Sequence, residues 1–157
     1  MSRILGLDVS TKTIGISLFE DNGESGKLQM LTHITPKVKP KPKDNIELLI
    51  KKAQIFQNEF LEKYSDIDIS RVIIEEPLVR SNNVNTVATL LRFNGMICRS
   101  VYEVLNIIPE FISSYDARKF AFPELMEIRK FNKKGEPYTE KEIERKQPVL
   151  FGGHSFD

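Results

Sequence analysis

One stretch, residues 4–18, restricts the fold of this chain more than any other. Residues 4–9 read Ile-Leu-Gly-Leu-Asp-Val and are apolar on both alternating faces except at Asp8. That pattern is typical of a strand in the middle of a sheet, covered on both sides. A polar turn follows, and residues 14–20 then alternate apolar with smaller or polar side chains, as a second strand does. A carboxylate in such a strand is costly unless it is paired, hydrogen-bonded or bound to a cation, so Asp8 is the first candidate functional residue.

Asp8 lies near the carboxyl end of the first predicted strand, where open α/β sheets place their ligands. The other interpretation is structural. Aspartate favours turns, and Asp8 could cap the polar turn through Ser10 and Thr11. The sequence leaves both roles open.

Composition narrows the class of protein. A chain of 157 residues is long enough for one domain with one core. Its 23 basic and 22 acidic residues leave a net charge of +1, so any contact with nucleic acid needs a local basic patch. The single cysteine, Cys98, excludes an internal disulfide and fits a reducing cytoplasm. The apolar runs are too short for a membrane span, and the N-terminus lacks a secretory signal pattern.

The remaining elements predict an α/β fold with a five-stranded mixed sheet flanked by helices. A third strand over residues 27–34 would complete an antiparallel meander. A helix over residues 44–64 would begin with Asp44 as N-cap and Glu47 as its third-position partner. The further predicted elements are a strand at 70–76, a helix at 85–105, a strand at 107–113, and short helices starting near 115 and 140.

The strand at 70–76 ends in Glu75 and Glu76, followed by Pro77. Because it follows a helix, we expect it to lie parallel to the first strand, with its acidic end at the edge that holds Asp8. Alternation allows only one of the two glutamates to share a face with Asp8. We choose Glu75, since the apolar run 72–74 leads directly into it. Two such carboxylates suit Mg²⁺, whereas the alternative is an acidic strand end that simply faces solvent.

Two further stretches each admit two interpretations. Residues 36–43 read Pro-Lys-Val-Lys-Pro-Lys-Pro-Lys, which could be an arm that touches phosphates or a solvated linker. In the helix at 85–105, small residues could pack against the core or against a partner subunit. The stripe at helical spacing consists of Val84, Val87, Ala88, Leu91, Gly95, Cys98, Val101 or Tyr102, and Leu105.

The residues at 4–15 (Ile-Leu-Gly-Leu-Asp-Val-Ser-Thr-Lys-Thr-Ile-Gly) and 72–77 (Val-Ile-Ile-Glu-Glu-Pro) resemble the first two motifs of RuvC-type Holliday junction resolvases. These belong to the ribonuclease H-like superfamily, and the resemblance covers roughly residues 3–120. It implies a ribonuclease H-like fold and a homodimeric endonuclease that depends on Mg²⁺, with Mn²⁺ as a substitute. Such an enzyme cuts four-way branched DNA by in-line attack of a metal-activated water. By this resemblance Asp8 and Glu75 are the catalytic residues and metal ligands.

Within that family, the residues at 80–83 (Arg-Ser-Asn-Asn) and 115–119 (Tyr-Asp-Ala-Arg-Lys) are similar to phage-type relatives. The resemblance implies DNA contacts in the loop after the glutamate and in a second basic pair, which could equally be a surface patch. The resemblance also suggests that the protein is located in the cytoplasm. If a phage encodes the protein, this is the cytoplasm of the host. The implied DNA contacts are Arg80, Asn82, Asn83, Arg118 and Lys119.

The chain departs from the family at its C-terminal end. The family has a C-terminal helix with one or two more acidic ligands, and no such pattern precedes residue 157. His154 and Asp157 have a usable spacing but follow paired glycines, which indicate a loop, and Asp116 fits a helix N-cap better than a ligand. We therefore expect a C-terminally truncated single domain spanning 1–157, with weak metal binding and little or no cleavage.

Two other classes of protein remain. An actin-like or sugar-kinase-type ATPase shares the strand-turn-strand with an early aspartate. It needs two such domains and glycine-rich loops, while this chain has only 8 glycines. A non-catalytic module that grips branched DNA without cutting it is the second, and the missing acidic helix favours it.

Overall fold

The computed structural model describes residues 2–23, 25–77, 83–116, 126–127, 134–145 and 149–150. The chain divides into two compact units, Met1–Phe111 and Ile112–Asp157. The sequence predicts one domain over the whole chain. The four long strands and both long helices belong to the first unit.

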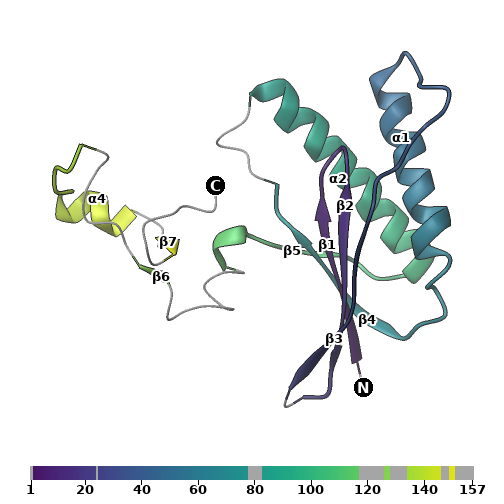
Figure 1. The fold of residues 1–157 in the computed structure, drawn as a ribbon, viewed down its shortest axis with the longest axis horizontal. Helices are drawn as coiled ribbons and strands as arrows, with labels where there is room; N and C mark the ends of the chain where they lie inside the picture. The colour runs from purple at the N-terminus through teal and green to yellow at the C-terminus, as the bar shows by residue number, and fades with distance from the viewer. Residues whose placement is uncertain are drawn as a thin grey trace. The chain divides into compact units, whose positions relative to one another are not determined.

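The main sheet has five strands in the order β3-β2-β1-β4-β5 (Figure 1). Its first three strands form the predicted antiparallel meander, and β4 pairs parallel to β1. The predicted five-stranded mixed sheet flanked by helices is therefore confirmed. The strands are β1 (Ser2–Val9), β2 (Ile14–Asp21), β3 (Gly26–Ile34), β4 (Ile69–Glu75) and β5 (Glu110–Ile112).

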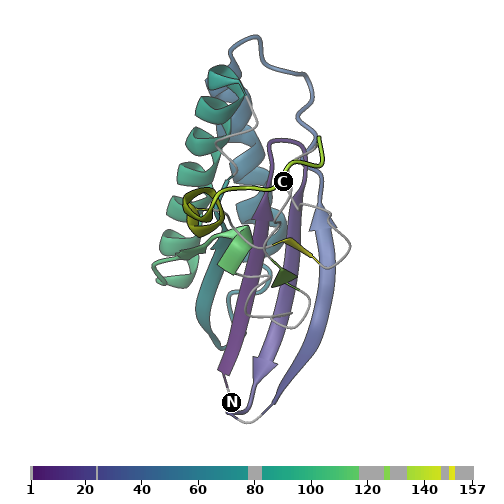
Figure 2. The same ribbon diagram turned by 90° about the vertical axis from the view of Figure 1, so that its left-hand side faces the viewer.

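Two long helices, α1 (Asn45–Phe56) and α2 (Val84–Leu105), lie side by side on one face of this sheet (Figures 1 and 2). Asp44 caps α1 as predicted, because its carboxylate accepts from the backbone N–H groups of Ile46 and Glu47 at 2.7 and 3.2 Å. The Glu47 side chain forms no hydrogen bond back to Asp44; it pairs with Lys51 at 3.1 Å. The N-cap of this helix was thus readable from the sequence.

The single helix predicted over residues 44–64 changes form after Phe56. The next five residues are the π-helical segment η1 (Gln57–Leu61), closed by a bond from Glu62 N–H to the Gln57 carbonyl at 2.9 Å. In an α-helix, residues five apart point in different directions, whereas a π-turn brings them close to alignment. The wider turn accounts for the burial of Phe56, Phe60 and Leu61 together in one core.

Strand alternation builds the core between the sheet and the helices. The buried residues of β1, β2 and β4 alternate with less buried ones, and they lie on the helix side. The other face of the sheet receives the intervening residues, among them Gly6, Asp8 and Ser17. The buried strand residues are Leu5, Leu7, Val9, Ile14, Ile16, Leu18, Val72 and Ile74.

The stripe predicted for α2, for which core packing and contact with a partner subunit were both open, is divided between the core and the surface. Its Val101 is fully buried, together with Phe93 and Ile97, which lie outside the stripe. Its Leu91 and Tyr102 are about half exposed, at 49% and 51%. This helix is apolar around most of its circumference, so spacing alone could not tell which arc meets the sheet.

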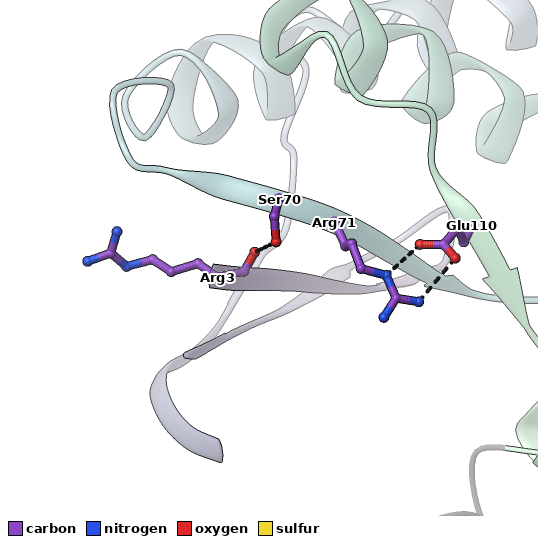
Figure 3. A network of polar contacts seen from close by, with 4 residues as sticks. All are labelled: Arg3, Ser70, Arg71 and Glu110. Carbon is purple, nitrogen blue, oxygen red and sulfur yellow. Dashed lines mark hydrogen bonds and ion pairs between the residues drawn. The ribbon is translucent and has the colours of Figure 1, made fainter. Parts of the chain in front are cut away.

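The edge strand β5 is attached to β4 by an ion pair with two hydrogen bonds (Figure 3). Arg71 donates from Nε to one oxygen of Glu110 at 2.8 Å and from a terminal nitrogen to the other at 3.0 Å. Beside it, the Ser70 hydroxyl donates to the Arg3 carbonyl at 3.1 Å and links β4 to β1. The predicted strand 107–113 is thus shorter, starting at the residue after Pro109, because proline cannot donate to a sheet.

We expect the Arg71→Gln substitution to raise the pKa of Glu110. The Arg71 hydrogen bond, aided by its charge, holds the pKa of this carboxyl below its ordinary value of 4.5. A depressed pKa stabilises the fold above the unfolded value, and this contribution is lost as the pH falls through the folded pKa. An NMR titration of the Glu110 carboxyl measures the shift, with Arg99→Gln, which removes the Arg99–Glu103 pair of α2, as the control. An unchanged Glu110 midpoint in Arg71→Gln would contradict the pairing.

In the second unit, β6 (Met126–Glu127) pairs antiparallel with β7 (Val149–Leu150). The short helix α4 (Glu140–Arg145) begins at the predicted position and is capped by Thr139, which accepts from the Glu142 N–H at 3.3 Å. The prediction that Asp116 is an N-cap is wrong: the Ser113 hydroxyl accepts from the Asp116 N–H at 3.0 Å and caps that turn. Among the described residues, no helix has the length and apolarity that crossing a bilayer requires.

Candidate metal and nucleic-acid site

The polar turn between β1 and β2 is closed by Ser10 rather than by Asp8. The Ser10 hydroxyl donates to the Thr13 carbonyl at 2.8 Å and accepts from the Thr13 N–H at 3.0 Å. The backbone N–H of Ser10 also donates to that carbonyl, at 3.0 Å. Asp8 is exposed, and no hydrogen bond or ion pair joins it to another residue of the described ranges. The turn therefore does not use its carboxylate, so Asp8 is not the cap of this turn. The prediction of a strand covered on both sides is wrong at Asp8, because its side chain is exposed and pays no cost of burial.

The register between β1 and β4 places Asp8 beside Glu75. Gly6 aligns with Ile73 and Leu7 with Ile74, so the next step along both parallel strands aligns Asp8 with Glu75. Leu7 and Ile74 are buried on the helix side. Because side chains alternate, both carboxylates belong to the opposite face, on strands about 4.8 Å apart. Glu76 follows the end of the strand, so alternation assigns a face to Glu75 alone of the two.

A row of residues continues from Asp8 across the sheet. Asp8 lies opposite Gly15 in β2, and Gly15 lies opposite His33 in β3. A side chain at Gly15 would start 3.4 Å from the Asp8 Cβ, so this glycine keeps the space next to the carboxylate open. His33 is exposed in the same row. It was not predicted from the sequence, although the two short connections of the meander fix the register that places it there.

Positive charge lies behind the same turn. The Lys52 ammonium of α1 donates to the Thr11 carbonyl at 2.6 Å. Partial burial lowers the pKa of Lys52, and the charge of Lys41 lowers it further. This contact could not be predicted from the sequence, because its partners are 41 residues apart and no local pattern links them.

The two carboxylates at the carboxyl ends of β1 and β4 fit a hard divalent cation. Mg²⁺ is usually bound through one or two carboxylates, with water and substrate oxygens as its other ligands. Asp8 and Glu75 supply two carboxylates on one face. Within the described ranges, no group of three or more His, Cys, Asp or Glu side chains could hold a metal ion. Any ion held by these two residues would therefore keep several positions for water and substrate.

The other predicted site residues divide into two groups. Asn83 is described and serves as the N-cap of α2, with its side-chain oxygen accepting from the Thr86 N–H at 2.8 Å. Its amide NH₂ is a separate group that could still donate to a ligand. Asp116 is exposed and belongs to the second unit. The remaining residues, Arg80, Asn82, Arg118, Lys119, His154 and Asp157, lie outside the described residues.

The sheet order, its mixed pairing and its helices define a ribonuclease H-like fold, the fold of RuvC-type resolvases. One similar structure is T. thermophilus RuvC in complex with Holliday junction substrate, with a TM-score of 0.59 and 10% identity, covering 76% of this chain and 69% of that one. A second Thermus thermophilus RuvC structure has a TM-score of 0.59 and 12% identity, covering 74% and 67%. The yeast mitochondrial Holliday junction resolvase Ydc2 has a TM-score of 0.55 and 15% identity, covering 78% and 56%.

The structural similarity at these low identities shows a shared fold. At the level of sequence, no protein-family model and no curated protein matches the chain.

Proposed function

We propose that this protein is a metal-dependent endonuclease that cuts branched DNA. The observation that carries the proposal is the placement of Asp8 and Glu75 on one face of neighbouring parallel strands. The fold adds support, since similar structures include a RuvC bound to a Holliday junction and a mitochondrial Holliday junction resolvase.

In the proposed reaction, Asp8 and Glu75 would hold Mg²⁺, for which Mn²⁺ would substitute. Such an ion neutralises charge on a phosphate and lowers the pKa of water. Glu75 also accepts a hydrogen bond from the attacking water and orients it in line with the bond to the 3′ oxygen. That bond would break as the water oxygen joins phosphorus; the water gives up a proton to solvent and the leaving 3′ oxygen takes one from solvent, which leaves 5′-phosphate and 3′-hydroxyl ends. Gly15 leaves room for the phosphodiester beside Asp8.

The proposed assembly is a homodimer on a four-way junction in the cytoplasm. The exposed apolar arc of α2 supports it, because Leu91, Tyr102 and Val84 face away from the core, with Val84 at 83% exposure. A side chain at Gly95 would meet nothing within 4 Å, so another helix can approach there closely. The proposed DNA contacts are Arg80, Asn82, Asn83, Arg118 and Lys119.

The matched pair Glu75→Gln and Glu76→Gln tests this proposal. We expect Glu75→Gln to weaken Mn²⁺ binding at least about tenfold and to abolish junction cutting, because a neutral amide is a poorer ligand for a hard cation. Glu76→Gln makes the same chemical change one residue later and should leave both unchanged. Mn²⁺ titration by water-proton relaxation and cutting of a labelled four-way junction are the measurements. Equal effects of the two substitutions would refute the assigned site.

A non-catalytic DNA-binding module is the second candidate. It is favoured by the lack of a third metal-ligating side chain near Asp8 and Glu75 within the described ranges. A module of this kind would bind the junction without cutting it in Mg²⁺ or Mn²⁺, and Asp8→Asn would then leave its behaviour unchanged.

A further inference from the structure

The loop between β3 and α1, residues 35–43, is the most strongly charged segment of the first unit. It carries Lys37, Lys39, Lys41 and Lys43 and no acidic residue. All four lysines are exposed, and none forms an ion pair with another described residue. We call this segment the lysine arm.

The lysine arm is attached at both ends. At its start, the hydroxyls of Thr35 and Thr13 share a hydrogen bond of 3.1 Å, and Pro36 is buried. At its end, Asp44 caps α1. A solvated linker would not need a buried anchor or a hydrogen bond to the β1–β2 turn. The structure thus favours a positioned surface over that alternative.

The lysine arm lies at the end of the sheet that holds Asp8. Figure 2 shows the loop rising from β3 and arching to the start of α1, at the same end as the β1–β2 turn. Lys41 is close enough to lower the pKa of Lys52, whose ammonium holds the Thr11 carbonyl. Lys12 is exposed in that turn as well. Like charges gathered in this way repel one another until an anion neutralises them.

From this placement we infer that the lysine arm binds the phosphate backbone of a DNA duplex beside Asp8 and Glu75. The inference rests on the proposed function and names a surface that the metal site alone does not supply. Flexible lysines act as point charges on phosphates and read no bases. The arm would therefore raise affinity for junction and linear duplex alike, and branch recognition would come from elsewhere.

Salt-dependent binding tests the inference with matched charge changes. The variant Lys39→Gln/Lys41→Gln removes two charges from the arm, and Lys27→Gln/Lys63→Gln removes two at β3 and beyond η1. Binding to a four-way junction and to linear duplex is measured without divalent metal, so that no cutting occurs. We expect the slope of log affinity against log salt to fall by about 2 for the arm variant and to stay unchanged for the control.

Each result has a defined meaning. If both double variants lower the slope equally, or neither does, while the parent binds DNA, the arm inference fails and the nuclease proposal is untouched. If the arm variant loses slope while the parent never cuts in Mg²⁺, the arm stands and the nuclease proposal fails. Sedimentation of the parent with phosphatidylserine vesicles, combined with no DNA binding, would overturn both and point to a lipid surface.

Discussion

The Asp8→Asn variant is expected to lose at least about 10³-fold in the rate of junction cutting, since metal-ion catalysis contributes several kcal/mol. The parent itself should cut slowly, because only two of the expected carboxylates are at hand, so the rates are compared at high enzyme concentration and long times. Junction binding without metal should be unchanged. The amide is nearly isosteric with the carboxylate, but it is a weak ligand for Mg²⁺. Single-turnover cutting of a labelled four-way junction gives the rate, and a gel-shift assay without divalent metal gives the affinity.

Stability measurements separate this effect from misfolding. Asp8 is exposed and the turn beside it is held by Ser10, so the substitution removes no contact that holds the fold. It also removes one of two like charges on adjacent strands, which should leave the metal-free Tm equal or slightly higher. Mg²⁺ should raise the Tm of the parent and not of the variant, because only a ligand of the folded state stabilises it.

The control for Asp8→Asn is Asp66→Asn, an exposed aspartate beyond η1. This variant should cut and bind as the parent does. If Asp8→Asn cuts a junction as fast as Asp66→Asn does, Asp8 is not a metal ligand of the reaction. The non-catalytic DNA-binding module is then the better description of this protein.

Features set by local chemistry could be predicted from the sequence. Alternation of apolar residues gives β1 and β2, and Asp44 at the start of an apolar stripe gives the cap of α1. A helix between two strands gives the parallel pairing of β1 with β4. Alternation also selects Glu75 over Glu76, because each strand residue has one of only two faces available to it.

Features set by distant contacts could not be predicted. The hydrogen bond from Lys52 to Thr11 depends on how α1 docks over the turn, which no local spacing encodes. The π-turn at η1 depends on the burial of Phe60 and Leu61 in a core completed by other elements. On α2, two arcs are apolar, and only the docked sheet decides that the arc with Phe93 is buried.

The two arcs of α2 give the second large expected effect. Phe93→Ala should lower the free energy of unfolding by about 3–5 kcal/mol, since Phe93 is fully buried and its removal leaves a cavity. Leu91→Ala, two residues earlier on the same helix, should cost less than about 1 kcal/mol, because this side chain is 49% exposed. Both substitutions introduce alanine into the same helix, so helix propensity favours each variant slightly and does not explain the difference.

Urea unfolding followed by circular dichroism measures both values, with equal m-values required for the comparison. A loss of this size is a large part of a typical total stability of about 5–15 kcal/mol. If Phe93→Ala does not fold, Ile97→Val provides a milder test at the fully buried Ile97, with an expected cost of about 0.5–1.5 kcal/mol. A larger loss for Leu91→Ala than for both core variants would mean that the arc of α2 with Leu91, and not the arc with Phe93, faces the sheet. The open face that supports a partner subunit would then lie on the other arc of the helix.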